Sequence, residues 1–581
     1  MKGADRGGPK AQGGGDSSDR PRVPDWLRSA VFYQVYPQSF YDGNGDGIGD
    51  LPGLTAKLDY LSFLGVTALW INPIYPSPFL DAGYDVTDHT GIAPRYGGEA
   101  DLTELLRQAH RRGIRVCLDL VPGHTSSDHP WFRASCRAET NPCTNRYIWT
   151  NSVWEEAGGD LRTISGFGER NGSYVTNFFY CQPALNYGFA RQEAGKSWQL
   201  PVDHPDVLIT REELKKIMRH WLDKEVDGFR VDMAFSLVKN DPGRRRTIEL
   251  WQEIRALLDR DYPQAVLLSE WGIPDQALQA GFHADLLIHG HLDGYTSLLR
   301  REIPWMHRSE AQGPSFFRRE GKGDPRLFVD EYLPLLERTR MLGYIAIPTG
   351  NHDMPRLSRG RTTREIELVF AWILTMPGLP FIYYGDEIGL RYLEGLPSVE
   401  GGYERTGSRT PMQWDRGPDA GFRSAGASEG ASAGASRGGA AASGRLYLPL
   451  DPAADRPCVA AQEADPESLL NRVRRLIRLR REHPALGAEG GLEVLFARRG
   501  RYPLIYLRRP PGAAGGTVLV ALNPAGRRVE AAFDLPAAPE EGSWLFNSGV
   551  QLKLGRGGSR LQGRLIMAPL SCGLYSWPGK N

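Results

Sequence analysis

The chain has 581 residues, of which 41% are hydrophobic and 24% are charged, as in ordinary globular proteins. Lys and Arg together number 70 against 69 for Asp and Glu, so the charge gives no reason to expect nucleic acid or an anionic membrane as a partner. The sequence contains no apolar run of about 18 residues, so no membrane-spanning helix is predicted. The charged, Gly-rich N-terminus lacks the apolar core of a signal peptide, so we expect a cytoplasmic location.

Residues 1–24 carry almost nothing that folding would bury, and we predict a disordered tail there. The six cysteines form no C-x-x-C pair and show no zinc-like spacing. We expect them to be reduced, as is usual in the cytoplasm, with a Cys136–Cys143 bridge as the alternative.

From Val31 onward, short apolar runs alternate with amphipathic helical segments such as 102–113 and 211–225. A strand followed by a helix, repeated about eight times, predicts an α/β fold, a parallel (β/α)8 barrel that spans residues 25–124 and 208–487. The sixth strand is predicted near Asp293–Leu299. The other seven predicted strands are 31–36, 67–72, 114–121, 227–232, 265–271, 343–349 and 380–385.

Three further segments interrupt or follow the predicted barrel. Residues 125–207, irregular and rich in aromatics, are too long for a loop and predict an inserted subdomain after the third strand. Residues 424–444 are almost entirely Gly, Ala and Ser and predict a flexible loop. After a last barrel helix at 467–486, short alternating apolar runs over 488–581 predict a C-terminal antiparallel β-domain.

The stretch YDGNGDGIGDLPG at 41–53 resembles the start of an EF-hand calcium loop. Asp42, Asn44 and Asp46 occupy alternate positions and a glycine follows, as that loop requires. The twelfth position, however, is Gly53, where an EF-hand has a bidentate Glu, so an EF-hand sensor is disfavoured. The residues alone leave two interpretations, a calcium loop on another fold or a polar turn.

Four predicted strands end in, or run directly into, an acidic residue: Asp119, Asp232, Glu270 and Asp353. In a parallel barrel these ends share one rim, where the chemistry of such folds takes place. Clustered carboxylates repel one another unless function requires them, so the rim is the predicted active site.

At these strand ends the sequence resembles glycoside hydrolase family 13, the α-amylase superfamily. Its four main motif regions are matched in order by DLVPGHTS (119–126), GFRVDMAF (228–235), LLSEW (267–271) and GNHDMPR (350–356). The segments 30–53, GYDVTD (83–88) and RTPMQWD (409–415) are similar to the oligo-1,6-glucosidase and trehalose synthase branch. The resemblance runs from about Val31 to the end of the chain.

The resemblance implies catalytic roles that the chemistry of these residues supports. Asp232 would be the nucleophile, held ionised and oriented by Arg230 on the same strand face. Glu270 would act as general acid and then as base, and Asp353 would bind sugar hydroxyls. Such a pair of carboxylates, about 5 Å apart, implies double displacement with retention of configuration.

The resemblance also implies a set of substrate-binding residues. His124 and His352 would hydrogen-bond the glucose unit, and Tyr84 would stack on it. Asp85 and Arg409 would pair and close the subsite around the non-reducing end, which favours exo-action on short oligosaccharides.

Two further residues complete the expected binding set. Gln182 belongs to the QPALN motif of the insert, and Met233 directly follows the nucleophile and would border the aglycone subsite. Met is long and adaptable, so we expect tolerance of both α-1,4 and α-1,6 bonds.

For the loop at 41–53, the resemblance implies a structural Ca²⁺, with Mg²⁺ as the alternative. The ligands would be Asp42, Asn44, Asp46, Asp50 and the carbonyl of Ile48. No organic cofactor is expected.

The chain departs from the family pattern at two positions. The family usually has Asn directly before the first-motif His, where this chain has Gly123. The insert motif usually has Asp where this chain has Ala184. Neither position is one of the three catalytic carboxylates, so the departures bear on the barrel–insert interface and on fine specificity.

The leading functional hypothesis is a retaining exo-α-glucosidase that acts on maltose-like or isomaltose-like substrates. The alternative is a trehalose synthase or other transglucosylase with the same residues, which differs in how far water is excluded from the closed site. A non-catalytic transporter subunit is disfavoured, because the carboxylates are present and no membrane anchor is predicted. The expected partner is a small oligosaccharide, with no nucleic acid or membrane, and the chain is expected to be a monomer or small homo-oligomer.

Overall fold

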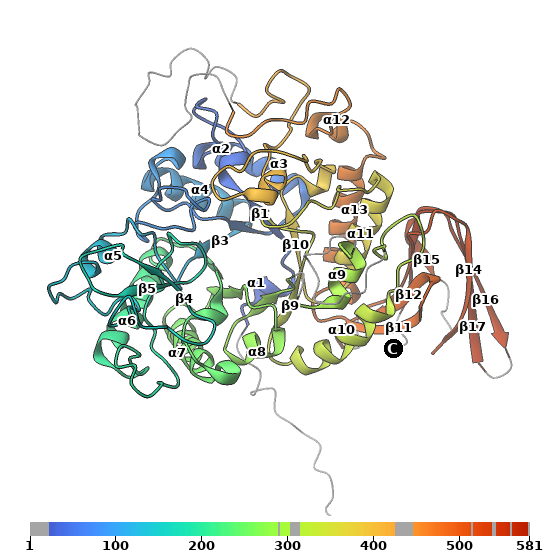
Figure 1. Ribbon diagram of the computed structural model, residues 1–581. Helices are drawn as coiled ribbons and strands as arrows, with labels where there is room; N and C mark the ends of the chain where they lie inside the picture. The colour runs from blue at the N-terminus through green and yellow to red at the C-terminus, as the bar shows by residue number, and fades with distance from the viewer. Residues whose placement is uncertain are drawn as a thin grey trace, which may run out of the picture.

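The computed structural model describes residues 23–288, 291–301, 314–423, 446–512, 515–536, 542–557 and 560–578. Its centre is a closed barrel of parallel strands in the order β1-β10-β9-β8-β7-β6-β3-β2 (Figure 1). These strands are β1 Phe32–Val35, β2 Ala68–Ile71, β3 Arg115–Leu120, β6 Gly228–Val231, β7 Val266–Ser269, β8 Ala284–Leu286, β9 Tyr344–Pro348 and β10 Leu379–Tyr383. The predicted (β/α)8 barrel is confirmed.

Seven of the predicted strands are present and the prediction for the sixth was wrong. Asp293–Leu299 is a helix, α9, and the sixth barrel strand is β8, Ala284–Leu286. This strand pairs with β7 and β9 on its two sides, with Ala284 opposite Tyr344 in β9. A three-residue strand is too short to show a periodic pattern, so only its neighbours in the barrel define it.

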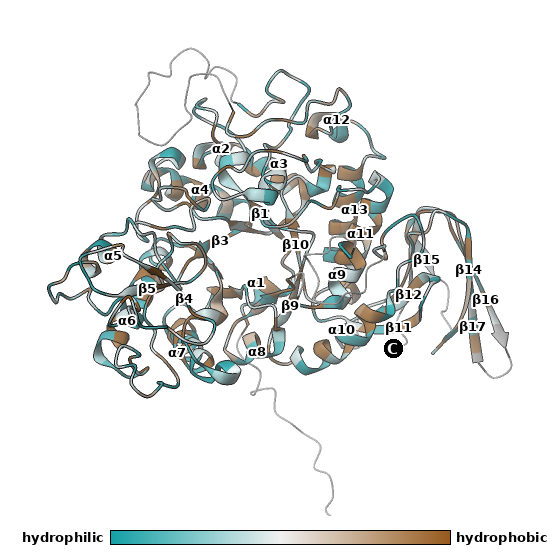
Figure 2. Ribbon diagram, in the orientation of Figure 1, coloured by the Kyte–Doolittle hydropathy of each residue, from teal (hydrophilic) through white to brown (hydrophobic). Residues whose placement is uncertain are grey.

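The helices that surround the barrel carry both hydrophilic and hydrophobic segments (Figure 2). They begin where local signals place them: α6 starts at Pro205, whose preceding residue His204 accepts a hydrogen bond from Asp206 N. Helix α13 ends at Glu482, two residues before Pro484. The helices are α1 Asp25–Arg28, α2 Leu51–Ala56, α3 Leu58–Leu64, α4 Glu99–Arg111, α5 Pro130–Ser135, α6 Pro205–Leu222, α7 Arg245–Asp261, α8 Pro274–Gln279, α9 Asp293–Leu299, α10 Arg326–Thr339, α11 Thr363–Thr375, α12 Val459–Glu463 and α13 Leu469–Glu482.

Between β3 and α6 the chain leaves the barrel and builds a separate layer, on the left in Figure 1. It contains the antiparallel strands β4, Arg162–Ser165, and β5, Ser173–Thr176. A small apolar cluster packs inside it, formed by Ile148, Ala157, Val175, Ala184, Phe189 and Trp198. An isolated bridge between His124 and Ala184 joins this insert to the end of β3.

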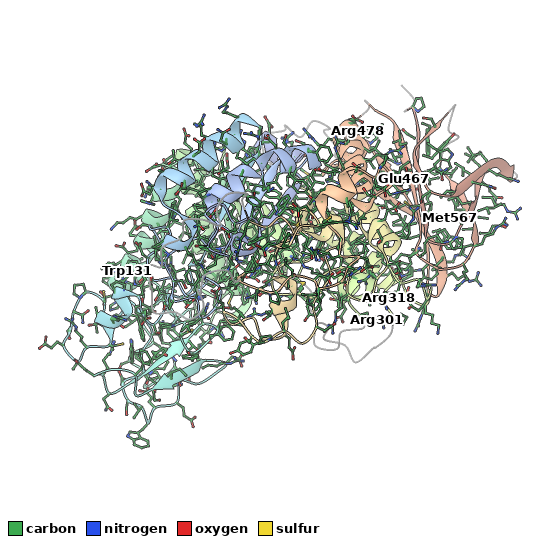
Figure 3. All side chains as sticks on the ribbon, turned by 90° about the horizontal axis from the view of Figure 1, so that it is seen from above. Trp131, Arg301, Arg318, Glu467, Arg478 and Met567 are labelled. Carbon is green, nitrogen blue, oxygen red and sulfur yellow. The ribbon has the colours of Figure 1, made fainter. Side chains whose placement is uncertain are left out.

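After the barrel the chain forms two antiparallel sheets. One has the order β11-β12-β13-β18-β15 and the other the order β14-β17-β16. Seen from above, Met567 in β17 lies at the end of the molecule opposite Trp131 in α5 (Figure 3). The strands are β11 Gly491–Arg498, β12 Arg501–Arg509, β13 Thr517–Asn523, β14 Val529–Leu535, β15 Ser543–Asn547, β16 Val550–Gly557, β17 Arg560–Met567 and β18 Ser571–Trp577.

Two buried arginines lie at the end of α11, and Arg508 of β12 joins it to the first sheet through the carbonyl of Thr375. The Arg480 guanidinium donates to the carbonyls of Leu374, Met376 and Gly378 at the end of α11, at 3.0, 2.8 and 2.5 Å. Arg508 on β12 donates to the carbonyl of Gly490 at 3.0 Å. These side chains satisfy carbonyls that the end of α11 and the following loop would otherwise leave unpaired in the interior.

Within the described residues, no helix is both long and apolar enough to cross a membrane. All six cysteines are unpaired, which excludes the Cys136–Cys143 bridge. Apart from residues 23 and 24, the predicted tail over 1–24 lies outside the described residues, as does the predicted flexible loop over 424–444.

Candidate active site

The centre of the site is the buried guanidinium of Arg230 on β6. Its Nη1 lies 2.9 Å from Asp119 Oδ1 and 3.1 Å from Asp232 Oδ1, and its Nη2 lies 2.7 Å from Glu270 Oε2. Asp119 is opposite Arg230 in the β3–β6 register, and Asp232 and Glu270 directly follow β6 and β7. One cation thus gathers the carboxylates from three neighbouring strand ends, as the barrel geometry requires.

Exposure separates the role of Asp119 from that of the other two carboxylates. The Asp119 side chain is fully buried, whereas those of Asp232 and Glu270 are 10% and 20% exposed. Asp119 Oδ2 also accepts hydrogen bonds from Trp70 Nε1 at 2.9 Å and Tyr84 OH at 2.8 Å. Asp119 therefore orients Arg230 from within the barrel, a role that the sequence did not assign.

Burial raises the pKa values of two carboxylates in this cluster. Burial and the neighbouring Glu270 raise the pKa of Asp232, and Arg230 opposes them. Burial likewise raises the pKa of Asp119 to about 6 despite Arg230 and its hydrogen bonds. Three carboxylates around a single guanidinium repel one another, and one proton held among them relieves that repulsion.

Asp353, after β9, lies in a second cationic cluster. Its Oδ1 is 2.5 Å from Arg405 Nη1 and 3.1 Å from Arg409 Nη2, and its Oδ2 is 3.3 Å from His352 Nε2. Burial alone would raise the pKa of Asp353, but His352 and the two arginines outweigh it and lower the pKa below its ordinary value. With its side chain 33% exposed, Asp353 presents an ionised carboxylate toward solvent.

The predicted histidines converge on Tyr84. The His352 and Tyr84 rings stack with centroids 5.3 Å apart and planes at 8°. His124 Nε2 lies 3.2 Å from the Tyr84 carbonyl oxygen, and its Nδ1 is 3.2 Å from the amide of Asn177. Burial lowers the pKa of each histidine to about 3, so both rings are neutral hydrogen-bonding groups at ordinary pH.

The predicted pair of Asp85 and Arg409 was wrong. Asp85 is buried and accepts hydrogen bonds from its own loop, from Ser77 Oγ at 2.8 Å and Leu80 N at 2.9 Å. Arg409 pairs with Asp353 instead. Asp85 is thus a structural residue of the loop and does not close the subsite.

The carboxylate that faces the arginines from this loop is Asp81. Its Oδ1 lies 3.7 Å from Arg405 Nη2, and its Oδ2 accepts a hydrogen bond from Gln182 Nε2 at 2.8 Å. Burial raises the pKa of Asp81 to about 6, and Arg405 and Arg409 oppose the shift. Neither Asp81 nor Arg405 is among the residues predicted from the sequence, because spacing alone does not tell which of Asp81 and Asp85 points out of the loop.

Gln182 and Met233 both lie at the site. Gln182 reaches Asp81 with its amide nitrogen, while its Oε1 accepts from Phe179 N at 2.7 Å, so it ties the insert to the barrel rim. Met233 N donates to Glu270 Oε2 at 3.1 Å from a left-handed backbone conformation, with φ 40°. Its Sδ lies 3.8 Å from the amide nitrogen of Asn177.

The two departures from the family pattern meet at one place. Leu185 N donates to Gly123 O at 3.1 Å, directly beside the bridge between His124 and Ala184. A Cβ on Gly123 would lie 2.7 Å from Asn177 Nδ2, so the glycine makes room for this amide against His124. Lys239 Nζ donates a hydrogen bond to Asn177 Oδ1, the oxygen of the same amide, at 3.2 Å.

The loop at 41–53 is organised by its own backbone. Asp42 accepts from Gly45 N at 2.6 Å and Gly47 N at 2.7 Å, and Asp50 accepts from Gly53 N at 2.6 Å. Burial raises the pKa of Asp50 to about 6, and the charge of Asp42 adds to the shift. The described residues contain no ready-made cluster of three His, Cys, Asp or Glu ligands.

The donor set of this loop nevertheless fits a hard cation. Asp42, Asn44, Asp46, Asp50 and the carbonyl of Ile48 offer only oxygen, the ligand type that Ca²⁺ and Mg²⁺ prefer. Burial and mutual repulsion raise the pKa of Asp42, which a cation among these oxygens would reverse.

A parallel barrel with carboxylates gathered at the ends of β3, β6 and β7 has the architecture of a barrel enzyme, whose chemistry takes place at that rim. The family model of the alpha-amylase catalytic domain matches residues 34–286 and 336–489. The trehalose synthase of Pimelobacter sp. is 34% identical over 550 residues, which cover 86% of this chain and 87% of that protein. The oligo-1,6-glucosidase of Parageobacillus thermoglucosidasius is 31% identical over 516 residues, which cover 79% of this chain and 84% of that protein.

Solved structures agree with these sequence comparisons. The trehalulose synthase of Pseudomonas mesoacidophila is 25% identical, with a TM-score of 0.73, and the match covers 95% of this chain and 100% of that one. The chain belongs to the alpha-amylase family, glycoside hydrolase family 13, and is an enzyme that acts on O-glycosyl bonds.

The contact between Asn177 and His124 can be tested through Gly123. We expect Gly123→Ala to lower kcat/KM on an aryl α-glucoside by roughly 10- to 100-fold, because the new methyl displaces the amide that orients His124. Asn177→Ala should give a loss of similar size. The double variant should be no worse than Asn177→Ala alone, since both changes act through one contact. Losses that multiply in the double variant would contradict this assignment.

The cationic cluster around Asp353 predicts a change in pH dependence. Arg405→Gln removes a positive charge that lowers the pKa of Asp353. That pKa should rise, so Asp353 should become protonated at a higher pH as the solution is acidified. The titration of the Asp353 carboxyl, followed by NMR of selectively labelled aspartate, should therefore move to higher pH. Arg338→Gln, at an exposed pair with Asp275, is the control, and an unchanged Asp353 titration in Arg405→Gln would refute the prediction.

Proposed function

We propose that the chain is a retaining exo-α-glucosidase that hydrolyses short α-glucosides of the maltose and isomaltose type by double displacement. The observation that carries the proposal is the guanidinium of Arg230, which holds Asp232 on one nitrogen and Glu270 on the other. Retaining glycosidases need two carboxylates about 5 Å apart, one ionised and one protonated. Asp232 and Glu270 thus lie on either side of one cation, where a glycosidic bond could meet both carboxylates.

In the first step, an Asp232 carboxylate oxygen attacks the anomeric carbon while Glu270 donates its proton to the departing glycosidic oxygen. The C–O bond to the leaving group breaks and an ester between the glucosyl unit and Asp232 forms. In the second step, Glu270 takes a proton from the incoming hydroxyl, whose oxygen displaces Asp232. Because each step inverts the anomeric carbon, the product keeps the α configuration.

The remaining residues would bind the glucosyl unit. Asp353, kept ionised by Arg405 and Arg409, would accept hydrogen bonds from sugar hydroxyls, with Asp81 beside it. Neutral His124 and His352 would supply further hydrogen bonds next to the Tyr84 ring. Met233 would border the leaving group and, as a flexible apolar side chain, would tolerate both α-1,4 and α-1,6 bonds.

The second candidate is transfer to a sugar in place of water, as in a maltose-to-trehalose isomerase. The likeness to the trehalose synthase of Pimelobacter sp. favours it, at 34% identity over most of both chains. Both activities use the same carboxylates, and the incoming hydroxyl decides between them. NMR analysis of the products from maltose, isomaltose and trehalose separates them: free α-glucose supports hydrolysis, and a rearranged disaccharide supports isomerisation.

The roles of the two carboxylates are tested by separate substitutions. Asp232→Asn should lower kcat by at least about 10⁴-fold on every glucoside, because no covalent intermediate forms. Glu270→Gln should keep much more activity on glucosides whose leaving group needs no protonation, such as a glucosyl fluoride. Equal losses on activated and unactivated substrates in Glu270→Gln would remove it as the acid. Circular dichroism checks that both variants fold.

We also propose that the loop at 41–53 binds Ca²⁺ as a structural ion, held by Asp42, Asn44, Asp46, Asp50 and the Ile48 carbonyl. A cation that binds only the folded chain stabilises it by mass action, by about 2.7 kcal/mol at 100 times the Kd. Wild type should melt at higher temperature with calcium than with chelator, and a double variant, Asp42→Asn with Asp46→Asn, should not respond. The control is Asp59→Asn at an exposed carboxylate. A wild-type melting temperature that calcium leaves unchanged would make the loop a polar turn.

A further inference from the structure

A buried aspartate lies directly behind the strand end that carries Glu270. Asp285 is the middle residue of β8, and in the β7–β8 register it is the partner of Ser269. Its side chain is fully buried. The residues on either side of it, Ala284 and Leu286, belong to an apolar cluster shared by most barrel strands. Because successive side chains of a strand alternate, Asp285 faces away from that cluster, toward the surrounding helices.

One oxygen of Asp285 holds the chain on both sides of Glu270. Asp285 Oδ1 accepts three hydrogen bonds, from Ser269 Oγ at 2.6 Å, Trp271 N at 3.0 Å and Gly272 N at 3.3 Å. The first donor directly precedes Glu270 and the other two directly follow it. These bonds therefore span the point at which β7 ends and the chain turns away, with φ 74° at Gly272.

The backbone that Asp285 fixes determines where the Glu270 carboxyl lies. Glu270 donates its own backbone N–H to Val231 O at 3.0 Å, and its Oε2 meets Arg230 Nη2 at 2.7 Å and Met233 N at 3.1 Å. These three contacts come from the β6 side, and Asp285 supplies the attachment on the β8 side. An acid held from both sides keeps one direction toward the proton acceptor, as general acid catalysis requires.

The second oxygen of Asp285 gains nothing in return for its burial. In the part of the chain that the structure describes, Oδ2 is buried and has no hydrogen-bond partner. Burial raises the pKa of Asp285 to about 7, the bonds to Oδ1 oppose the shift, and the charge of Glu270 adds to it. A buried polar atom without a partner costs free energy, so efficient core packing does not explain an aspartate here. The three bonds to Oδ1 do.

We propose that Asp285 is a positioning residue for Glu270: through Oδ1 it fixes the end of β7 so that the Glu270 carboxyl meets the departing glycosidic oxygen. Asp285 touches no substrate and acts only through the backbone on either side of the acid. The inference rests on the proposed function, in which Glu270 donates a proton in the first step. It applies to hydrolysis and to transfer alike, because both begin with that step.

The leaving group distinguishes positioning from a general structural role. Asp285→Ala should lower kcat/KM for maltose about 100-fold, because a misplacement of about 1 Å is enough for a loss of that size. With glucosyl fluoride, whose leaving group needs no proton, kcat/KM should fall less than about threefold, since it reports only the step that forms the ester. Equal falls on the two substrates would overturn the proposal.

Asp285→Asn separates positioning from stability. Its amide oxygen can accept from the same donors, so kcat/KM for both substrates should stay within about threefold of wild type. The amide nitrogen would replace Oδ2, which has no partner, and an unpaired buried donor should lower the melting temperature. A loss on maltose as large as that of Asp285→Ala would overturn the role given to Oδ1.

Ser269→Ala tests the same contact from its other end and keeps the chain intact if Asp285→Ala fails to fold. It removes one of the three donors, so kcat/KM for maltose should fall about tenfold and that for glucosyl fluoride should not change. The double variant should lose less than the product of the single losses, because both changes act through one contact. An unchanged value for maltose in Ser269→Ala would count against the proposal.

Asp227→Ala is the matched control. Asp227 is also a buried barrel carboxylate that accepts a backbone N–H, from Val116 at 2.8 Å. It directly precedes β6, at the end of the strands opposite the catalytic rim. Its loss should lower the melting temperature and leave the ratio of kcat/KM for maltose to that for glucosyl fluoride unchanged. The same fall in this ratio as in Asp285→Ala would refute a role specific to Glu270.

A crystal structure of Asp285→Ala shows the position of the acid directly. Glu270 Oε2 should leave hydrogen-bond distance of Arg230 Nη2 or of Met233 N, and an unmoved carboxyl would overturn the proposal. A wild-type enzyme that turns over neither maltose nor glucosyl fluoride would refute the proposed function instead, and the crystal structure would still report on Asp285.

Discussion

The whole site depends on one buried positive charge. A guanidinium removed from water is costly unless it is paired with anions, and the two terminal nitrogens of Arg230 are paired with Asp119, Asp232 and Glu270. Arginine suits this place because its planar fork can bond several carboxylates at once, which a lysine cannot do. The closed barrel supplies the geometry, since it brings the ends of β3, β6 and β7 to one rim.

The same charge explains why the carboxylates tolerate one another. Without Arg230, Asp119 and Asp232 would be buried anions at close range, and each would be forced toward its protonated form. Asp119 is the fixed support of the cluster, because Trp70 and Tyr84 hold its second oxygen. Asp232 and Glu270 stay partly exposed and are the members that a substrate can reach.

Around this centre, the residues near Asp353 come from loops in distant parts of the chain. Arg405 and Arg409 follow β10, Asp81 follows β2, and Gln182 comes from the insert, yet all four meet near Asp353. The reacting carboxylates thus come from barrel strand ends, whereas the groups around Asp353 come from loops and from the insert. Loops can vary while the barrel keeps its carboxylates, which is how one fold supports several functions.

The sequence by itself determined the barrel, seven of its strands and the carboxylates at their ends, because alternating buried strands and amphipathic helices are local patterns. It also determined the family, since the motifs around Asp119, Arg230, Glu270 and Asp353 are short and specific. Only the tertiary structure decided that β8 is a strand, because three residues carry no periodicity and pairing with two neighbours defines them. It also decided that Asp81, and not Asp85, faces the arginines, and that Gly123 makes room for Asn177. These features rest on contacts between segments far apart in the chain, and the direction in which a loop side chain points is settled only when those segments pack together.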